Sequence, residues 1–197
     1  MIVLASGSAT RRHVLEQAGL VFTVDTASVD EDAVKRAMAL DSAQPGDIAE
    51  ALAELKAIRV SARHPGSLVI GADQMLDCDG VLFDKPADGA EARRHLAQLR
   101  GRTHRLTSAV VAVRDGRRVW HHRDEASLTM RHFSEDFLDV YLAKVGDGVL
   151  TSVGAYQIEG LGVQLFSSVA GDYFTILGLP LLPVLDFLRA NGEIVPC

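Results

Sequence analysis

The chain has few cysteines, no long hydrophobic run and no excess of basic residues. Its two cysteines, Cys78 and Cys197, form no C-x-x-C pair, which argues against a disulfide framework and a zinc knuckle. Few cysteines and no recognisable signal peptide favour the reducing cytoplasm. The longest apolar stretch, ILGLPLLPVLDFL, is interrupted by Pro180 and Pro183, and it is shorter than the roughly 20 residues of a membrane span. We therefore expect a cytoplasmic protein without a membrane segment.

The charge balance excludes further classes of function. The formal net charge is -6 at pH 7, whereas proteins that bind nucleic acid polymers or anionic membranes need a basic face. The chain has 197 residues, of which 48% are hydrophobic, and this is enough to build a sizeable core. We expect a single domain over residues 1–197, either undivided or folded as two lobes around a central cleft.

Apolar strands alternate with amphipathic helices, and this pattern predicts an α/β fold with a mixed sheet. Asp79-Gly80 and Asp115-Gly116 are typical of tight hairpin turns. We expect Asp47 to cap a second helix and Ser134 to cap a later one. The expected strands cover 2–5, 68–70, 106–114, 117–133 and 155–174, and the stretch 21–29 is expected to be extended. The other expected helices cover 9–18, 88–100, 135–144 and 180–191.

The stretch LASGSATRR places small polar residues and two arginines where a strand leads into a helix. Such a junction exposes free backbone N–H groups at the positive end of the helix dipole, where anions bind. Arginine adds paired donors that match phosphate oxygens. Ser6, Ser8 and Arg11 therefore fit a phosphate-binding loop, and they fit equally well a capped surface helix with solvated arginines.

The other candidate groups are weak when each is taken alone. Asp73 follows an apolar strand, where a carboxylate can bind a divalent metal or accept a proton, but a turn-forming aspartate fits as well. Lys85 precedes a proline and could meet a phosphate, although a solvated lysine is the simpler interpretation. Lys56 lies beside an apolar helical stripe and by default reaches past the core to solvent. In SVGAYQIEGLG, Tyr156 could pack near a flat ligand and Glu159 could face a groove, or the segment could be a bend with an exposed glutamate.

The order of these motifs is more specific than any one of them. The chain resembles the Maf family of nucleoside triphosphate pyrophosphatases along almost its full length. The matching pieces are LASGS..RR..L...G, VDE, L...KA, GADQ, DKP, LRGRTH..TSAV, GAYQIEGLG and GDYFTILGLPL. The resemblance implies an elongated mixed sheet with surrounding helices, shared with inosine triphosphatase-like enzymes. It also implies hydrolysis of a nucleoside triphosphate to the monophosphate and diphosphate with a divalent metal cation, Mg²⁺ or Mn²⁺.

The resemblance also assigns roles to residues of this chain. It makes Asp73 the proton acceptor for the attacking water, and it makes Glu31, of the acidic run at residues 30–32, a metal partner together with Asp73. Without a metal, that acidic run is expected to be a solvated turn. Ala9 stands where the family usually has proline, which lowers the expected rigidity of the loop. The groups assigned to phosphate binding are Ser6, Ser8, Arg11, Lys56 and Lys85.

Three positions indicate the branch of the family. Thr10, Gln74 and Glu159 depart from the branch that acts on dTTP and UTP, and they resemble the branch that hydrolyses 7-methyl-GTP. A carboxylate accepts hydrogen bonds only, so Glu159 suits the N1–H and amino edge of a guanine and the positive charge of a 7-methylated base. The expected reaction is therefore hydrolysis of 7-methyl-GTP to 7-methyl-GMP and diphosphate.

Two other functions stay open at this point. One is a dTTP, UTP or CTP pyrophosphatase of the same family. The other is a non-catalytic nucleotide-binding regulator of cell division, although retention of Asp73, Lys56 and Lys85 favours catalysis. The expected partner is a nucleoside triphosphate, with no nucleic acid polymer and no membrane. A homodimer through an apolar surface is compatible with the sequence, and the physiological role, nucleotide house-cleaning or division control, is left open.

Overall fold

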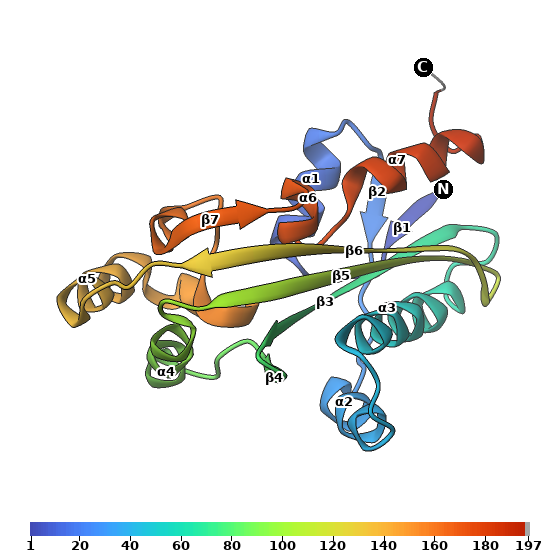
Figure 1. Cartoon of the computed structure of the whole chain (residues 1–197). Coiled ribbons are helices and arrows are strands. Elements are labelled where there is room, and N and C mark those ends of the chain that lie inside the picture. The colour runs from blue at the N-terminus through green and yellow to red at the C-terminus, as the bar shows by residue number, and fades with distance from the viewer. Residues whose placement is uncertain (196–197) are drawn as a thin grey trace. The chain divides into compact units, whose positions relative to one another are not determined.

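Strands and helices alternate along the chain much as the hydrophobic pattern predicts (Figure 1). The protein is described here as a computed structural model that covers residues 1–195. Strand pairing follows the order β2-β1-β3-β5-β6-β7, with β4 paired to β3. The parallel pairs β1–β2 and β1–β3 and the antiparallel pairs β3–β4 and β6–β7 make the sheet mixed, as expected.

The elements have the following bounds. The strands are β1 (Ile2–Leu4), β2 (Phe22–Val24), β3 (Leu68–Cys78), β4 (Val81–Phe83), β5 (Thr103–Arg114), β6 (Arg117–Met130) and β7 (Phe166–Ala170). The helices are α1 (Ala9–Gln17), α2 (Glu31–Leu40), α3 (Pro45–Ser61), α4 (Gly89–Leu99), α5 (Glu135–Val145), α6 (Tyr173–Ile176) and α7 (Leu181–Ala190). Three short 3-10 helices are η1 (Gly146–Leu150), η2 (Val153–Ala155) and η3 (Leu161–Leu165).

The chain folds as two compact units, each built from separate stretches of sequence. Unit 1 contains Met1–Gln74, Thr107–Asp124 and the described residues from Asp172 onward, and unit 2 contains Met75–Leu106 and Glu125–Gly171. Strands β3, β5 and β6 contribute residues to both units.

In unit 1, strand β3 packs against helices on both of its faces. Leu68, Ile70 and Ala72 belong to a buried cluster with residues of α1 and α7. Val69 belongs to a second cluster with small residues of α3. Figure 1 shows the same arrangement, with α3 on one face of the strands and α1, α6 and α7 on the other. This two-sided cover explains why β3 begins with a continuous apolar run.

Helix α3 reaches β3 closely because Gly71 has no side chain. A Cβ placed on Gly71 would lie 2.1 Å from the carbonyl oxygen of Ala53 and 3.0 Å from the Cβ of Ala57. Side chains alternate along a strand, so Val69, Gly71 and Asp73 point to the same face, toward α3. The glycine therefore lets α3 approach the strand just beside Asp73.

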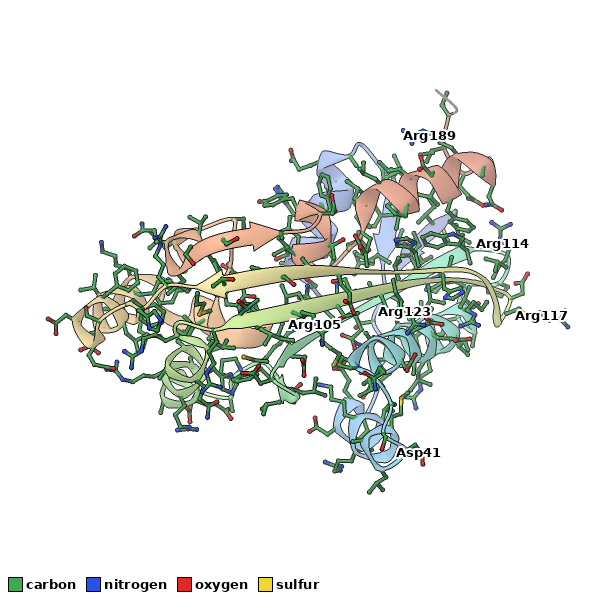
Figure 2. The ribbon with its side chains drawn as sticks, in the orientation of Figure 1. Asp41, Arg105, Arg114, Arg117, Arg123 and Arg189 are labelled. Atoms are coloured by element: carbon green, nitrogen blue, oxygen red, sulfur yellow. The ribbon has the colours of Figure 1, made fainter. Side chains whose placement is uncertain are left out.

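Ion pairs connect α3 to β6 within unit 1. Glu50 contacts Arg118, His121 and Arg123, at 2.8, 3.1 and 3.0 Å. Figure 2 labels Arg123, which also contacts Asp47 at 2.6 Å. The expectation that Asp47 caps α3 is wrong by three residues. The helix begins at Pro45, and the Asp47 carboxylate reaches back to accept the backbone N–H of Gln44 at 3.3 Å.

In unit 2, sequence-predicted turns and caps are confirmed. Asp79 and Gly80 both have positive φ and join β3 to β4, as the hairpin signal predicts. Ser134 caps α5 by accepting the N–H of Phe137 at 3.1 Å. His104 and Tyr156 form a buried pair, with 2.7 Å between Nε2 and the phenol oxygen.

Three expectations about local structure are wrong. The acidic run at residues 30–32 is not a loose turn, because Asp30 caps α2 and the next two residues form its first helical turn. Strand β3 does not end at Ile70 but continues to Cys78. Most of 155–174 is not strand, since η2 and η3 precede the short β7 and the backbone at Gly154 and Ala155 has positive φ.

The structure also bears on the predictions about membrane segments and cysteines. No helix within the described residues is long and apolar enough to cross a membrane. Cys78 is buried as a free thiol, and Cys197 lies outside the described residues.

Candidate active site

Asp73 lies inside β3 rather than after it, so the turn interpretation is wrong. Its side chain points toward α3, where the Lys56 ammonium lies 3.5 Å from its Oδ2 atom. The same ammonium lies 2.6 Å from Oε1 of Glu31, in the first turn of α2. One lysine thus joins two carboxylates that are 42 positions apart in the sequence (31 and 73), and it does so because Gly71 admits α3.

The two oxygens of Asp73 have different surroundings. Oδ1 accepts the backbone N–H of Gln74 at 2.9 Å. Oδ2 is buried and has no hydrogen-bond partner among residues 1–195. Its 3.5 Å contact with Lys56 is an ion pair whose geometry does not satisfy a hydrogen bond. A buried carboxylate oxygen without a donor is costly to maintain, so Oδ2 is the atom poised to take a proton or a cation.

Lys56 does not reach past the core to solvent, as its default interpretation predicts. Only 13% of its side chain is exposed, against 40% for Glu31. A buried ammonium needs partners of opposite charge, and the two carboxylates supply them. Lys56 therefore holds positive charge at Asp73 before any substrate arrives.

Arg11 is buried and makes three contacts within unit 1. Its Nε donates to the carbonyl oxygen of Gly178 at 2.7 Å, and its Nη1 donates to Ala72 O at 2.8 Å and to Ser6 Oγ at 3.1 Å. Burial lowers the pKa of Arg11, while the negative charges of Asp73 and Glu31 act to raise it. An arginine remains charged under these conditions. The solvated-arginine interpretation is thus wrong for this residue.

The loop before α1 is organised by its serines. Ser8 caps the helix by accepting the N–H of Arg11 at 3.3 Å, and Ser6 Oγ accepts the N–H of Ser8 at 3.4 Å. Thr10 is half-buried in the first helical turn. The hydroxyls of Ser6 and Ser8 shape the loop, so any phosphate contact here would also involve the backbone N–H groups at the start of the helix.

The residues present fit a divalent cation that is shared with substrate. Within the described residues, no group of three or more histidine, cysteine, aspartate and glutamate side chains could hold a metal by itself. Mg²⁺ is typically bound by one or two carboxylates together with substrate phosphates. Glu31 and Oδ2 of Asp73, which accepts no hydrogen bond from the described residues, supply the one or two carboxylates that such a site needs.

Gln74, predicted to help select the base, is engaged on the opposite face of β3. Its Nε2 lies 3.0 Å from Ser108 Oγ and 3.1 Å from each of the carbonyl oxygens of Thr175 and Ile176. Ser108, Thr175 and Gly178 have no role predicted from the sequence. The pieces TSAV and TILG of the family resemblance contain them, but a buried serine or threonine looks the same in sequence whether it packs or supports a site.

Lys85 and Glu159 belong to unit 2, and their assigned roles remain predictions. Lys85 is exposed just after β4, before a turn in which Ala87 donates its N–H to Glu91 at 2.7 Å. Glu159 is exposed between η2 and η3. Tyr156 is only 4% exposed and packs in the core of unit 2, so the expectation that it lies near a ligand is not supported.

Comparison with known proteins identifies the family. The model of the Maf-like protein family matches residues 1–191. A nucleoside triphosphate pyrophosphatase of Paramagnetospirillum magneticum is 70% identical over 194 residues, which are 98% of this chain and 100% of that protein. A 7-methyl-GTP pyrophosphatase of Rhizobium etli is 52% identical, covering 98% of this chain and 97% of that protein. A protein of the same name from Brucella abortus is 50% identical, covering 95% and 94%.

A solved structure, the dITP/XTP pyrophosphatase of Mycobacterium abscessus, covers 99% of this chain and 97% of its own at 18% identity and a TM-score of 0.42. That similarity is too low to add to the family assignment. The match to the family model and the 70% identity are sufficient without it. The chain belongs to the Maf family.

Proposed function

We propose that this protein hydrolyses 7-methyl-GTP to 7-methyl-GMP and diphosphate. As a member of the Maf family with relatives of that activity, it is a nucleoside triphosphate pyrophosphatase, a hydrolase of a phosphoanhydride bond. The observation that carries the chemistry is the buried Oδ2 of Asp73, which accepts no hydrogen bond from the described residues and lies 3.5 Å from Lys56, the lysine that also pairs with Glu31.

In the proposed reaction, Asp73 Oδ2 takes a proton from water as the water oxygen attacks the α-phosphorus. The bond from that phosphorus to the bridging oxygen breaks, and its electron pair leaves with diphosphate. Lys56 supplies positive charge against the phosphate oxygens, and Arg11 Nη2 and Lys85 are the further donors that we assign to them. A divalent cation held by Glu31 and the substrate phosphates would neutralise part of the triphosphate charge and leave Oδ2 of Asp73 to take the proton.

The choice of base rests on Glu159. Its carboxylate is exposed at a glycine-rich turn, where it can accept from the N1–H and amino group of a guanine and attract the charge of a methylated ring. Relatives at 50 and 52% identity carry the name 7-methyl-GTP pyrophosphatase. A pyrimidine would instead present its O2 or O4 acceptors to the carboxylate, which disfavours the dTTP, UTP and CTP alternative.

A non-catalytic nucleotide-binding regulator is the second alternative. A protein that only binds has no need of a carboxylate oxygen kept buried without a donor, because that arrangement costs folding free energy. The geometry at Asp73 therefore favours catalysis.

The test of the substrate is a turnover panel. Diphosphate release would be measured for 7-methyl-GTP, GTP, dTTP, UTP and CTP, each with Mg²⁺, with Mn²⁺ and with a chelator. We expect the highest kcat/KM for 7-methyl-GTP and loss of turnover with the chelator. A higher kcat/KM for any pyrimidine triphosphate would contradict the proposed substrate.

The Glu159→Gln variant tests the selecting residue. A neutral amide loses the attraction for the methylated base, so we expect the ratio of kcat/KM for 7-methyl-GTP to that for dTTP to fall by about tenfold or more. The matched control is Asp136→Asn, which removes an exposed carboxylate from α5 of the same unit. An unchanged ratio in Glu159→Gln would remove Glu159 from base selection.

A further inference from the structure

Both chain neighbours of Asp73 are attached to one segment, Thr175–Gly178. On one side, the carbonyl of Ala72 accepts Arg11 Nη1, and Nε of the same arginine donates to Gly178 O. On the other side, the amide of Gln74 donates to the carbonyls of Thr175 and Ile176. The segment comes from α6 and the residues after it, about 100 positions further along the chain than Asp73 (175 against 73).

Ser108 fixes which way the Gln74 amide faces. Its hydroxyl donates to Thr175 O at 2.8 Å and has only one hydrogen to give, so toward Gln74 it acts as an acceptor. The carbonyls of Thr175 and Ile176 are acceptors as well. Three acceptors therefore surround Nε2, and its two hydrogens are shared among them, so this nitrogen has no donor left for a base. Ser108 and Thr175 are completely buried, which makes the loss of these hydrogen bonds costly.

Thr175 is itself held from two directions. Its hydroxyl lies 2.7 Å from Oδ2 of Asp124 on β6, and its backbone N–H donates to Asp172 Oδ1 at 3.0 Å. The segment that receives the Gln74 amide is thus anchored to β6 and to the cap of α6. This anchoring holds residues 175–178 in place, so their carbonyl groups can fix the position of the Gln74 side chain on β3.

Gln74 acts on Asp73 through the backbone. The N–H of Gln74 donates to Asp73 Oδ1 at 2.9 Å, and that bond leaves Oδ2 as the oxygen without a donor. Because consecutive strand residues point to opposite faces, a Gln74 side chain fixed on the α6 face sets the orientation of the Asp73 carboxylate on the α3 face.

We propose that Gln74 and Ser108 are positioning residues for Asp73, and that Gln74 does not read the base. This inference rests on the proposed function, in which Asp73 takes the proton from water. Gln74 thus influences the rate of hydrolysis and not the choice of nucleotide. It differs in this from Glu159, which belongs to unit 2.

The experiment compares Ser108→Ala and Gln74→Met with the wild type on 7-methyl-GTP and on dTTP. Small misplacements of a reacting group lower rates strongly, so we expect kcat to fall about 10- to 100-fold for both nucleotides. KM and the ratio of kcat/KM between the nucleotides should be nearly unchanged. The matched control is Ser61→Ala, which also deletes a buried hydroxyl of unit 1, one that accepts the N–H of Gly116 at 3.0 Å. It should lower the melting temperature without lowering kcat.

Two results would overturn the inference. A tenfold or greater change in the nucleotide ratio of Gln74→Met would make Gln74 a reader of the base. Equal kcat losses in Ser108→Ala and Ser61→Ala, at equal losses of melting temperature, would show that these hydrogen bonds stabilise the fold and do not position Asp73. If the wild type prefers another triphosphate, the substrate proposal fails, but the comparison of kcat and KM is then made on that triphosphate and still decides the role of Gln74.

Discussion

Two buried polar clusters, one in each unit, differ in charge. Unit 1 keeps its groups charged and paired, with Lys56 between Glu31 and Asp73 and a buried Arg11 nearby. In unit 2 the buried pair of His104 and Tyr156 is neutral, since burial lowers the pKa of His104 to about 4 and raises the pKa of Tyr156 well above its ordinary value. Burying a charged group costs folding free energy, so a buried charge is often kept where the charge is used. The comparison supports the proposal that the proton acceptor lies in the charged cluster of unit 1, and it favours a structural role for the neutral pair of His104 and Tyr156.

We expect the largest effect from removing the negative charge of Asp73 in the cluster of unit 1. Asp73→Asn keeps the size of the side chain but cannot take a proton from water, so we expect hydrolysis to fall by about 10²–10⁴-fold. Nucleotide binding, followed by calorimetry, should persist because Lys56 and Arg11 remain. The matched control is Asp77→Asn, a carboxylate on the same strand but in unit 2. Near-normal turnover by Asp73→Asn would refute its assignment as the proton acceptor.

A second change separates α3 from β3. In Gly71→Ala the new methyl group would lie 2.1 Å from a backbone oxygen, and we expect the free energy of unfolding to fall by about 1–3 kcal/mol. Activity should fall as well, because Lys56 moves with the helix. Denaturant titration and kcat measure the two effects.

The control for this change is Gly89→Ala in α4, where a Cβ meets nothing within 4 Å. Gly89 is the first residue of α4, so its replacement should stabilise the protein by less than the roughly 1 kcal/mol of a glycine in a helix interior. An equal loss of stability in both variants would show that the close contact at Gly71 is not what holds α3 in place.

The neutral pair of unit 2 predicts how stability depends on pH. His104 has a pKa of about 4 in the folded protein against an ordinary value of 6.5, so below pH 6.5 the unfolded chain binds a proton that the folded chain does not. The stabilisation is complete above about pH 6.5 and is lost as the pH falls toward 4. Denaturant titration at several pH values should show this loss.

The variant His104→Gln should flatten that slope, although His95, whose pKa is also lowered by burial, will retain part of it. The exposed His132 supplies the control, and His132→Gln should leave the slope as it is in the wild type. The same slope in His104→Gln as in the wild type would contradict a neutral buried His104.

The smallest expected effect concerns Glu31, which is the more exposed of the two carboxylates on Lys56. Glu31→Gln should raise the Mg²⁺ concentration needed for half-maximal rate by about tenfold. Mn²⁺ binding followed by electron paramagnetic resonance gives a readout that does not depend on turnover. Glu16→Gln, which removes an exposed partner of Arg12, is the control. Unchanged Mn²⁺ binding in Glu31→Gln would exclude Glu31 as a cation ligand.

Features with a local cause were predictable from the sequence. Asp115 and Gly116 take positive φ in a two-residue turn, and Ser134 caps a helix through its own hydroxyl, because both depend on a few adjacent residues. The mixed sheet also followed from the apolar pattern. The order of motifs pointed to Asp73 and Lys56, and the structure brings these two together.

Features with a tertiary cause were not predictable. The importance of Gly71 in β3 depends on its distance to Ala53 in α3. The hydrogen bonds of the Gln74 side chain depend on carbonyl groups about 100 positions further along the chain. The segment around Gly154 has the apolar residues of a strand, but its backbone adopts positive φ and 3-10 turns. Composition and spacing carry no information about these contacts.

Because part of the network around Asp73 comes from Thr175–Gly178, about 100 positions after Asp73 (175 against 73), the order of synthesis matters. A nascent polypeptide that has already formed β1, α1 and β3 still lacks the carbonyls of Thr175 and Gly178. The carboxylate that we propose as the proton acceptor gains these contacts only after residues 175–178 have left the ribosome. We expect products that end before residue 175 to hydrolyse little nucleoside triphosphate.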